Sequence, residues 1–248
     1  MTRINKFLAE CGVCSRREAD RLIESGRVSV NGKTAVSGMQ VSDTDDVEVD
    51  KNPAGRAAEK VVLAYNKPVG VTCTEKDRHA EMTIIEALQY PVRLTYAGRL
   101  DRESDGLMIM TNDGELIQRM MKGANRHEKE YAVRVDKELT DSALEGMSRG
   151  VYFKELDKTT RPCKLKKTGK YTFRIILTQG LNRQIRRMCE CFGYRVSSLT
   201  RVRIMNIELR GLKAGEYREL HGEELSALYE ACGMNEPGKG KFINGGGQ

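Results

Sequence analysis

The sequence predicts an α+β protein with a small N-terminal domain over residues 1–50 and a larger domain over residues 61–232. Apolar residues recur at helical spacing near the N-terminus, and apolar and polar residues alternate in several later segments, as they do in half-buried strands. Residues 51–60 show no periodic apolar pattern, which is typical of a linker. The glycine-rich residues 233–248 are expected to form a flexible tail.

The small domain is expected to begin with two helices and to continue with short strands. Apolar side chains in residues 4–11 have helical spacing. Ser15 and Glu18 form a capping box that opens a second helix. Asn31 and Gly32 together are a strong signal for a hairpin turn. The expected elements are helices over 4–11 and 15–25 and strands over 28–30 and 47–49.

The larger domain is expected to hold a mixed, mainly antiparallel β-sheet with flanking helices. Segments of alternating or continuous apolar character predict strands, and segments with helical spacing or capping residues predict helices. The expected strands cover 61–65, 107–111, 131–135, 171–178 and 202–209, and the expected helices cover 84–88, 115–121, 141–147, 184–192 and 225–232.

The charge of the chain favours a polyanionic partner. Lys and Arg number 42 against 35 Asp and Glu, a net charge of +7, and they cluster near the N-terminus and around Arg183 to Arg187. Two separate basic regions suit nucleic acid. Seven cysteines, an odd number, without an apolar signal segment indicate a reducing compartment. No segment approaches membrane-spanning length, so the sequence predicts a cytoplasmic protein.

A metal site is not expected, because the candidate ligands do not form a matching set. Cys11 and Cys14 have a spacing found in zinc sites, but no second pair of cysteine or histidine residues accompanies them. The three histidines lie far apart in the sequence. The chain also lacks a glycine motif for a dinucleotide or a phosphate loop, so the sequence predicts no cofactor.

The segment from Gly98 to Leu107 is the most informative part of the sequence. It places Asp101 directly after an Arg-Leu pair, and Gly98 and Gly106 allow a tight, exposed loop between ordered segments. A carboxylate held on such a loop beside a cation suits a nucleophile, because it is ionised, positioned and reachable. An Arg-Leu-Asp triplet alone is more often a surface ion pair in a turn, so the argument depends on the whole segment.

This segment resembles the signature of the ribosomal RNA pseudouridine synthases. Three others resemble that family's motifs in order and spacing: Asn66–Gly70, Lys129–Tyr131 and Gly180–Met188. The resemblance implies a pseudouridine synthase catalytic domain behind an alpha-L RNA-binding domain like that of ribosomal protein S4. It implies isomerisation of a specific uridine in 23S (large-subunit) ribosomal RNA, by base flipping and by aspartate-dependent cleavage and re-formation of the glycosidic bond.

The resemblance also implies roles for individual residues. Asp101 is the expected nucleophile or general base, and the atom on which it acts stays open. Arg186 is expected to form an ion pair with Asp101, and Tyr131 to stack on the target uracil. Ile185 is expected to pack against the base or sugar, and Arg99 to fill the space left by the flipped base or to contact the RNA backbone. Without the resemblance, Tyr131 would be an ordinary half-buried core residue.

The other expected contacts are made by basic residues with RNA. A charge run is ordinarily a solvated face. Here basic residues gather on and beside the first two helices, and they are partly offset by Glu10, Glu18, Asp20 and Glu24. By resemblance to S4-like domains, this face would lie on RNA phosphates, which position the RNA without reading its sequence. The further residues expected to bind RNA are Lys129, Arg183, Arg187, Arg3, Lys6, Arg16, Arg17 and Arg21.

Two alternatives stay open from the sequence. One is a non-catalytic RNA-binding factor of ribosome assembly, which has no need of a carboxylate facing an anionic polymer. The other is a pseudouridine synthase that acts on small-subunit ribosomal RNA or transfer RNA. The expected partner is large-subunit ribosomal RNA, free or in an assembly intermediate, and the expected state is a monomer without a membrane partner.

Overall fold

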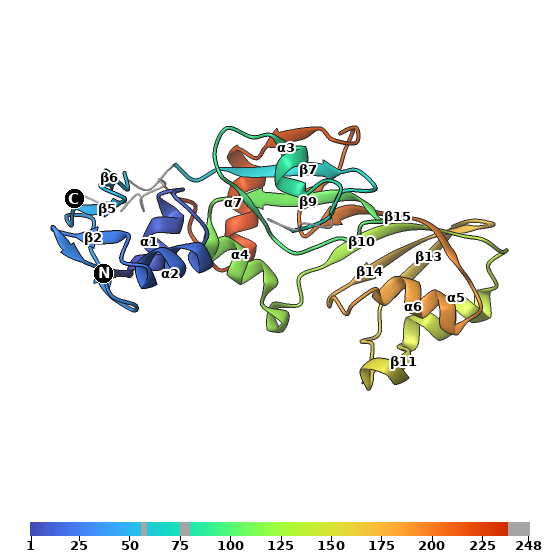
Figure 1. Ribbon diagram of the computed structural model, residues 1–248. Coiled ribbons are helices and arrows are strands. Elements are labelled where there is room, and N and C mark those ends of the chain that lie inside the picture. The colour runs from blue at the N-terminus through green and yellow to red at the C-terminus, as the bar shows by residue number, and fades with distance from the viewer. Residues whose placement is uncertain (56–58, 75–79, 238–248) are drawn as a thin grey trace, which may run out of the picture. The chain divides into compact units, whose positions relative to one another are not determined.

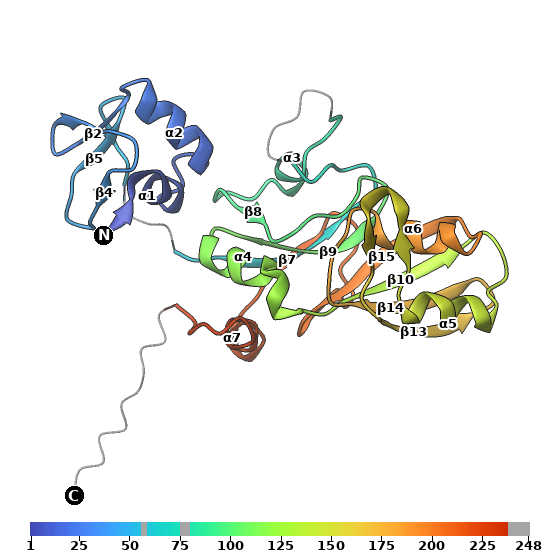
Figure 2. The same cartoon turned by 90° about the horizontal axis from the view of Figure 1, so that it is seen from below.

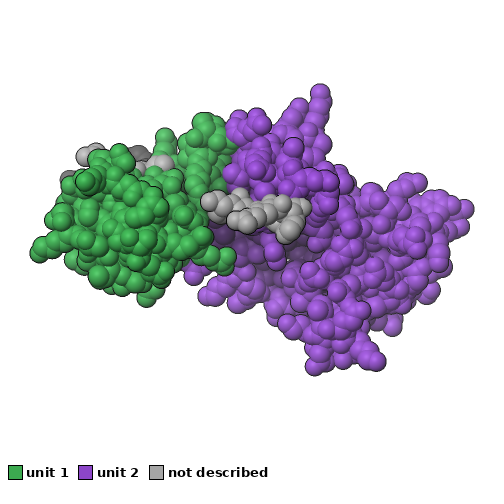
Figure 3. Space-filling model, in the orientation of Figure 1, with its two compact units in different colours: residues 1–61, 90–94, 112–114 green, residues 62–89, 95–111, 115–248 purple. Residues whose placement is uncertain are grey.

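Two groups of residues pack around separate hydrophobic cores in the computed structural model, which describes residues 1–55, 59–74 and 80–237. Unit 1 comprises residues 1–61, 90–94 and 112–114, and unit 2 comprises the rest (Figure 3). The predicted tail lies outside the described residues from position 238 on. Its first residues are part of the fold, since Met234 packs against the core of unit 2.

Unit 1 contains the two helices that the apolar spacing predicts, α1 (Ile4–Glu10) and α2 (Arg16–Glu24). Ser15 precedes α2, and its hydroxyl accepts a hydrogen bond of 3.2 Å from the backbone N–H of Glu18. This bond satisfies one of the donors that the first turn of a helix leaves free. Buried Ile4 and Leu8 of α1 and Leu22 of α2 join one core.

The strands of unit 1 form two small antiparallel sheets. In one, β1 (Thr2–Arg3) pairs with β4 (Gln40–Val41). The other has the order β3-β2-β5-β6, with β2 at Val28–Val30, β3 at Lys33–Thr34, β5 at Val47–Val49 and β6 at Asn52–Pro53. Strand β6 and the buried Ala54 fall within the predicted linker, so the small unit continues past residue 50.

Unit 2 is built on a nine-stranded sheet of order β13-β14-β10-β15-β9-β7-β17, with β16 paired to β15 and β8 to β9. Strands β9 and β15 are parallel and the other pairs are antiparallel, so the sheet is mixed and mainly antiparallel, as predicted. The strands are β7 (Val62–Lys67), β8 (Thr95–Tyr96), β9 (Asp105–Thr111), β10 (Lys129–Val135), β13 (Lys164–Gly169), β14 (Thr172–Leu177), β15 (Val196–Ile204), β16 (Ile207–Glu208) and β17 (Tyr217–Glu219).

Helices cover the sheet of unit 2 on both faces (Figures 1 and 2). Helices α5 and α6 share one core cluster with β10 and β14, and α4 and α7 share another with β7 and β9. Leu199 of β15 belongs to the first cluster and Ile204 to the second. These two residues are separated by a bulge in β15, so the faces are assigned from β9. Arg201, the cross-strand neighbour of Tyr131, contacts the side chain of Met108, so Leu107 and Ile109 of the second cluster lie on the opposite face of the sheet. The helices are α3 (Ile84–Leu88), α4 (Gly114–Met121), α5 (Asp141–Arg149), α6 (Gln184–Cys191) and α7 (Gly222–Ala231).

The short elements of unit 2 lie in its connections. The turns η1 (Gly123–Asn125) and η2 (Lys154–Leu156) are 3₁₀ helices. The hairpin of β11 (Tyr152–Phe153) and β12 (Lys158–Thr159) encloses η2.

The expected strand over 202–209 is wrong in its bounds. Strand β15 begins earlier, at Val196, and ends at Ile204, and the chain then turns so that β16 pairs back on β15. Met205 adopts a positive φ of 53° in this turn. The polar run Ser197-Ser198 hides the start of β15, because its strand state depends on pairing with the distant strands β9 and β10.

The parallel pair β9 and β15 requires a glycine. Gly106 lies beside Arg201 with φ of +107°, and a Cβ atom there would lie 2.3 Å from the carbonyl oxygen of Arg201 and 2.6 Å from its nitrogen. Neither backbone atom can move without disturbing the pairing. Because β9 follows directly from the loop with Asp101, this close approach fixes where that loop ends.

Gly106→Ala is expected to lower the free energy of unfolding by about 3 kcal/mol, from the positive φ and the backbone overlap together. Urea denaturation followed by circular dichroism measures the change. Gly211→Ala is the matched control, because a Cβ at Gly211 meets no heavy atom within 4 Å. Equal midpoints for the two variants would contradict the close approach.

Candidate active site

Asp101 lies in the loop between β8 and β9, and this loop is tied to the segment after β7. The backbone N–H of Gly70 donates to the carbonyl of Arg102 at 2.8 Å, and the Arg102 Nε donates back to the Gly70 carbonyl at 3.3 Å. Leu100 is buried, and its N–H donates to the sulfur of Cys73 at 3.4 Å. The carboxylate of Asp101 is thereby held on a fixed backbone while its side chain stays 31% exposed.

Lys67, the last residue of β7, stabilises the segment that follows this strand. Its side chain is fully buried, and its Nζ donates to the carbonyls of Pro68 at 2.8 Å and Val71 at 2.9 Å. Burial lowers the pKa of Lys67. Lys67 therefore holds in place the segment to which the Asp101 loop is hydrogen-bonded.

Arg186 of α6 reaches the same loop from the other side. Its Nη2 donates at 3.2 Å to both the Glu103 carbonyl and the Ser104 hydroxyl, and its Nη1 donates to the Val196 carbonyl at 3.4 Å. The Nε of this nearly buried side chain makes no hydrogen bond and lies 3.9 Å from Oδ2 of Asp101. The structure therefore brings Asp101 and Arg186 within ion-pair distance.

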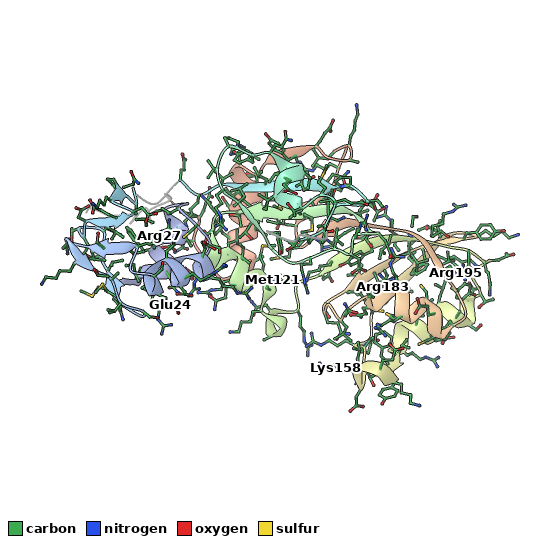
Figure 4. All side chains as sticks on the ribbon, viewed as in Figure 1. Glu24, Arg27, Met121, Lys158, Arg183 and Arg195 are labelled. Carbon is green, nitrogen blue, oxygen red and sulfur yellow. The ribbon has the colours of Figure 1, made fainter. Side chains whose placement is uncertain are left out.

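Two further charges complete a cluster of four. Arg183 immediately precedes α6 with φ of 50° (Figure 4). Its Nη1 lies 3.8 Å from Oδ2 of Asp101. The Glu103 carboxylate lies 3.3 Å from Nη1 of Arg183 and 3.7 Å from Nε of Arg186. Two carboxylates thus face two guanidinium groups, and the charges balance.

Tyr131 lies on the same face of the sheet as α6. In β10 it pairs with Arg201 of β15, which in turn pairs with Gly106 of β9. Its half-buried side chain packs against the cluster that contains Ile185. Tyr131 is therefore two strands away from the end of the Asp101 loop, on the side from which Arg186 approaches.

The other residues expected at the site differ in exposure. Ile185 is only 4% exposed and packs in the core, so its contact with the substrate stays a prediction. Arg99 is exposed, and Arg187 is half-buried and paired with Glu155. Lys129 is half-buried, and its pKa is lowered by burial and then by Arg201.

The basic residues expected to bind RNA in unit 1 form a separate group. Arg3, Arg16 and Arg17 are exposed, whereas Lys6 pairs with Glu10 at 3.6 Å and Arg21 with Glu18 at 3.1 Å. The intrahelical acidic partners reduce the free charge of the face, whereas Arg16 and Arg17 at the start of α2 make no ion pair with any described residue.

Sequence reasoning missed two residues of the site. Nothing in the sequence distinguishes Glu103 from an ordinary turn residue, yet its carboxylate belongs to the charge cluster. Arg201 is fully buried, and its Nε donates to the Leu107 carbonyl at 2.7 Å and its Nη1 to the Arg99 carbonyl at 3.5 Å. An arginine in a strand gives no sequence signal for such burial.

Within residues 1–55, 59–74 and 80–237, no group of three or more His, Cys, Asp or Glu side chains could hold a metal ion. None of the helices in that described part of the chain has the length and apolar character needed to cross a membrane.

Comparison with protein families gives two matches. Residues 61–191 match the family described as RNA pseudouridylate synthase. Residues 2–47 match the S4 domain. The first match contains the Asp101 loop, Tyr131 and Arg186, and the second contains α1 and α2.

Curated relatives match over most of the chain. The Salmonella typhi protein named dual-specificity RNA pseudouridine synthase RluF is 47% identical over 231 residues, covering 92% of this chain and 79% of the relative. RluF of Escherichia coli K12 is 46% identical over 230 residues, covering 92% and 78%. Ribosomal large subunit pseudouridine synthase B of Pseudomonas aeruginosa is 36% identical over 242 residues, covering 94% and 63%.

A solved structure has the same fold. The crystal structure titled pseudouridylate synthase superposes with a TM-score of 0.68 at 28% sequence identity, and the match covers 92% of this chain and 100% of that one.

Lys67→Met tests the support beneath the Asp101 loop. Because burial lowers the pKa of Lys67 below 10.5, the unfolded chain binds this proton more tightly than the folded chain. Stability from this group therefore grows as pH rises from the folded pKa toward 10.5. We expect the urea midpoint of the wild type to rise with pH relative to that of Lys67→Met. The variant should also be less stable by about 2 kcal/mol, because it leaves two carbonyls without a donor.

Lys213→Met is the control for losing a lysine, since Lys213 is exposed. The prediction would be contradicted if the urea midpoints of the wild type and of Lys67→Met changed equally with pH over the alkaline range, because the pKa of Lys67 would then not be lowered by burial.

Proposed function

Because this chain belongs to the RNA pseudouridylate synthase family, as its four motifs predicted, we propose that its substrate is a specific uridine of large-subunit ribosomal RNA. The family converts uridine to pseudouridine, so the chain is an enzyme of the isomerase class. The segments Asn125–Tyr131 and Gly180–Tyr194 resemble large-subunit member F of the family, and relatives at 46–47% identity carry the name RluF.

Relatives support the choice of substrate and add a second one. The protein named ribosomal large subunit pseudouridine synthase B supports large-subunit ribosomal RNA. The RluF relatives are named dual-specificity RNA enzymes, which supports a second RNA target for this chain. The proposal includes a cytoplasmic monomer that acts on free RNA or on an assembly intermediate, with the catalytic domain in unit 2 and the RNA-binding domain in unit 1.

The partly exposed Asp101 carboxylate between Arg186 and Arg183 is the observation that carries the proposed mechanism. A nucleophile or general base must be charged, oriented and open to substrate. The two guanidinium groups orient the carboxylate at 3.8–3.9 Å without a direct hydrogen bond, so its oxygens keep their lone pairs for the substrate. A protein that only binds RNA gains nothing from a carboxylate here, which disfavours a non-catalytic assembly factor.

Base flipping assigns tasks to the surrounding residues. An enzyme cannot reach a base inside a helical stack, and extrusion costs a few kcal/mol. In this proposal Tyr131 stacks on the flipped uracil, Ile185 packs on the other side, and Arg99 fills the vacated space or contacts the backbone. Arg186 positions Asp101, and Lys129, Arg183 and Arg187 bind phosphates around the site.

Asp101→Asn is expected to reduce turnover by about a thousandfold or more while RNA binding survives, because the variant keeps the shape of the side chain and loses its charge. Product is measured on unmodified large-subunit ribosomal RNA by mapping carbodiimide-resistant reverse-transcription stops. Asp141→Asn removes an exposed carboxylate on α5 and is the control. Product formation by purified Asp101→Asn at the control rate would rule out the assignment.

Arg16→Glu combined with Arg17→Glu is expected to weaken RNA binding and to lower its dependence on salt. Each lost phosphate contact should reduce the slope of log K against log salt by about 0.7–0.9. Filter binding from low to moderate salt gives the slope, and Arg16→Lys with Arg17→Lys is the charge-preserving control. A slope equal to that of the wild type would mean that this part of unit 1 does not touch phosphates.

A further inference from the structure

The half of the sheet formed by β13, β14 and β10 is buried on one face only. In β14 the side chains of Phe173, Ile175 and Leu177 are buried, while those between them are partly exposed. Helices α5 and α6 lie on the buried face (Figures 1 and 2). On the other face, none of the side chains of these strands within the described residues is buried.

The uncovered face gathers cations from all three strands. Leu165 packs toward the core, so its neighbours Lys164 and Lys166 point to the opposite face. Lys166 lies directly across from Arg174 of β14, on the same face of the sheet. Arg134 of β10 lies on this face too, directly across from Thr172. We call these four residues, Lys164, Lys166, Arg174 and Arg134, the basic sheet face.

The basic sheet face keeps most of its charge unpaired. Glu130 lies on it and approaches Arg174 at 3.6 Å, but this carboxylate also accepts a hydrogen bond of 3.1 Å from Nε of Arg203. Lys164 and Lys166 are exposed and make no ion pair with any described residue. The guanidinium of Arg134 lies 5.9 Å from the ring centre of Tyr171, a contact that leaves its charge intact.

Protection of a sheet edge does not explain this pattern. Lysines on an edge strand prevent pairing with other chains, and β13 is an edge strand. Arg174 and Arg134, however, lie on the inner strands β14 and β10, where no edge needs protection. Hydroxyl side chains lie between the cations on the same face: Thr172, Ser198 and Thr200. Lys, Arg, Ser and Thr are the side chains that contact phosphate oxygens in nucleic-acid complexes.

The basic sheet face is turned away from the reaction centre. Tyr131 and α6, which carries Arg186, lie on the opposite face of the same sheet. A nucleotide held at Asp101 therefore leaves the basic sheet face free. We propose that the basic sheet face binds the phosphate backbone of a second RNA segment, distinct from the one that contains the target uridine.

This inference rests on the RNA substrate of the proposed function and extends it. Ribosomal RNA is long and folded, so separate segments can contact two faces of one sheet. The second contact adds affinity without reading sequence, because phosphates carry no base information. A short hairpin around the target uridine would fill the Asp101 site alone, whereas a long RNA fragment would contact both faces.

Lys166→Glu tests the proposal, with Lys213→Glu as the matched control. Both lysines are exposed and both changes lower the net charge by the same amount. On a long fragment of unmodified large-subunit ribosomal RNA, we expect Lys166→Glu to raise Kd severalfold and to reduce the salt slope by about 0.7–0.9, and we expect Lys166→Arg to restore both. On a hairpin cut around the mapped uridine, Lys166→Glu and Lys213→Glu should have equal Kd and kcat.

Equal Kd values and salt slopes for Lys166→Glu and Lys213→Glu on the long RNA would overturn the proposal, and would leave an acidic protein as the partner for this face. A loss that is equally large on the hairpin would also overturn it, because the face would then serve the target segment. Product formation by the wild type tests the proposed function separately, since the binding comparison does not need turnover.

Discussion

The arrangement of the site depends on the guanidinium group of Arg186. This group joins α6 to a loop 83 residues earlier in the chain through the Glu103 carbonyl and the Ser104 hydroxyl. A nearly buried cation is costly unless it is hydrogen-bonded and its charge is compensated. Asp101 and Glu103 supply that compensation. Arg186 can therefore be buried only if the two carboxylates lie next to it. Its contacts fix the positions of the loop, α6 and β15 relative to one another.

Local chemistry explains which parts of the fold the sequence predicts. The cap at Ser15 and the turn at Asn31-Gly32 are determined by neighbouring residues, and the structure has both, with Asn31 and Gly32 at positive φ. Strand β15 depends instead on partners far away in the chain, so the polar residues at its start gave no sign of it. Lysine-rich β13 was missed for a related reason: lysine has low strand propensity, and the strand is stabilised by its pairing with β14.

The residues of the proposed site also fall into two groups, those that sequence motifs predict and those that depend on distant contacts. Asp101, Tyr131 and Arg186 were predicted as site residues because whole motifs resemble a family, and no single residue would have been enough. Glu103 looks like an ordinary turn residue until the fold brings α6 against its loop. Arg201 looks like an outward-facing strand residue, yet it is fully buried between β9 and the loop backbone. Both depend on contacts between segments that lie far apart in the sequence.

The balanced charges around Asp101 separate two physical tasks. Two carboxylates and two guanidinium groups leave the proposed reaction centre close to neutral, whereas the basic residues of α2 and of the basic sheet face, which we propose bind RNA, are not part of this cluster. Dissolved ions screen exposed charges strongly and enclosed pairs weakly. With the proposed roles, ionic strength is expected to affect the binding of RNA more strongly than the pair of Asp101 with the nearly buried Arg186. An enzyme built this way can release a long polyanion after each turnover without weakening the interactions that make it a catalyst.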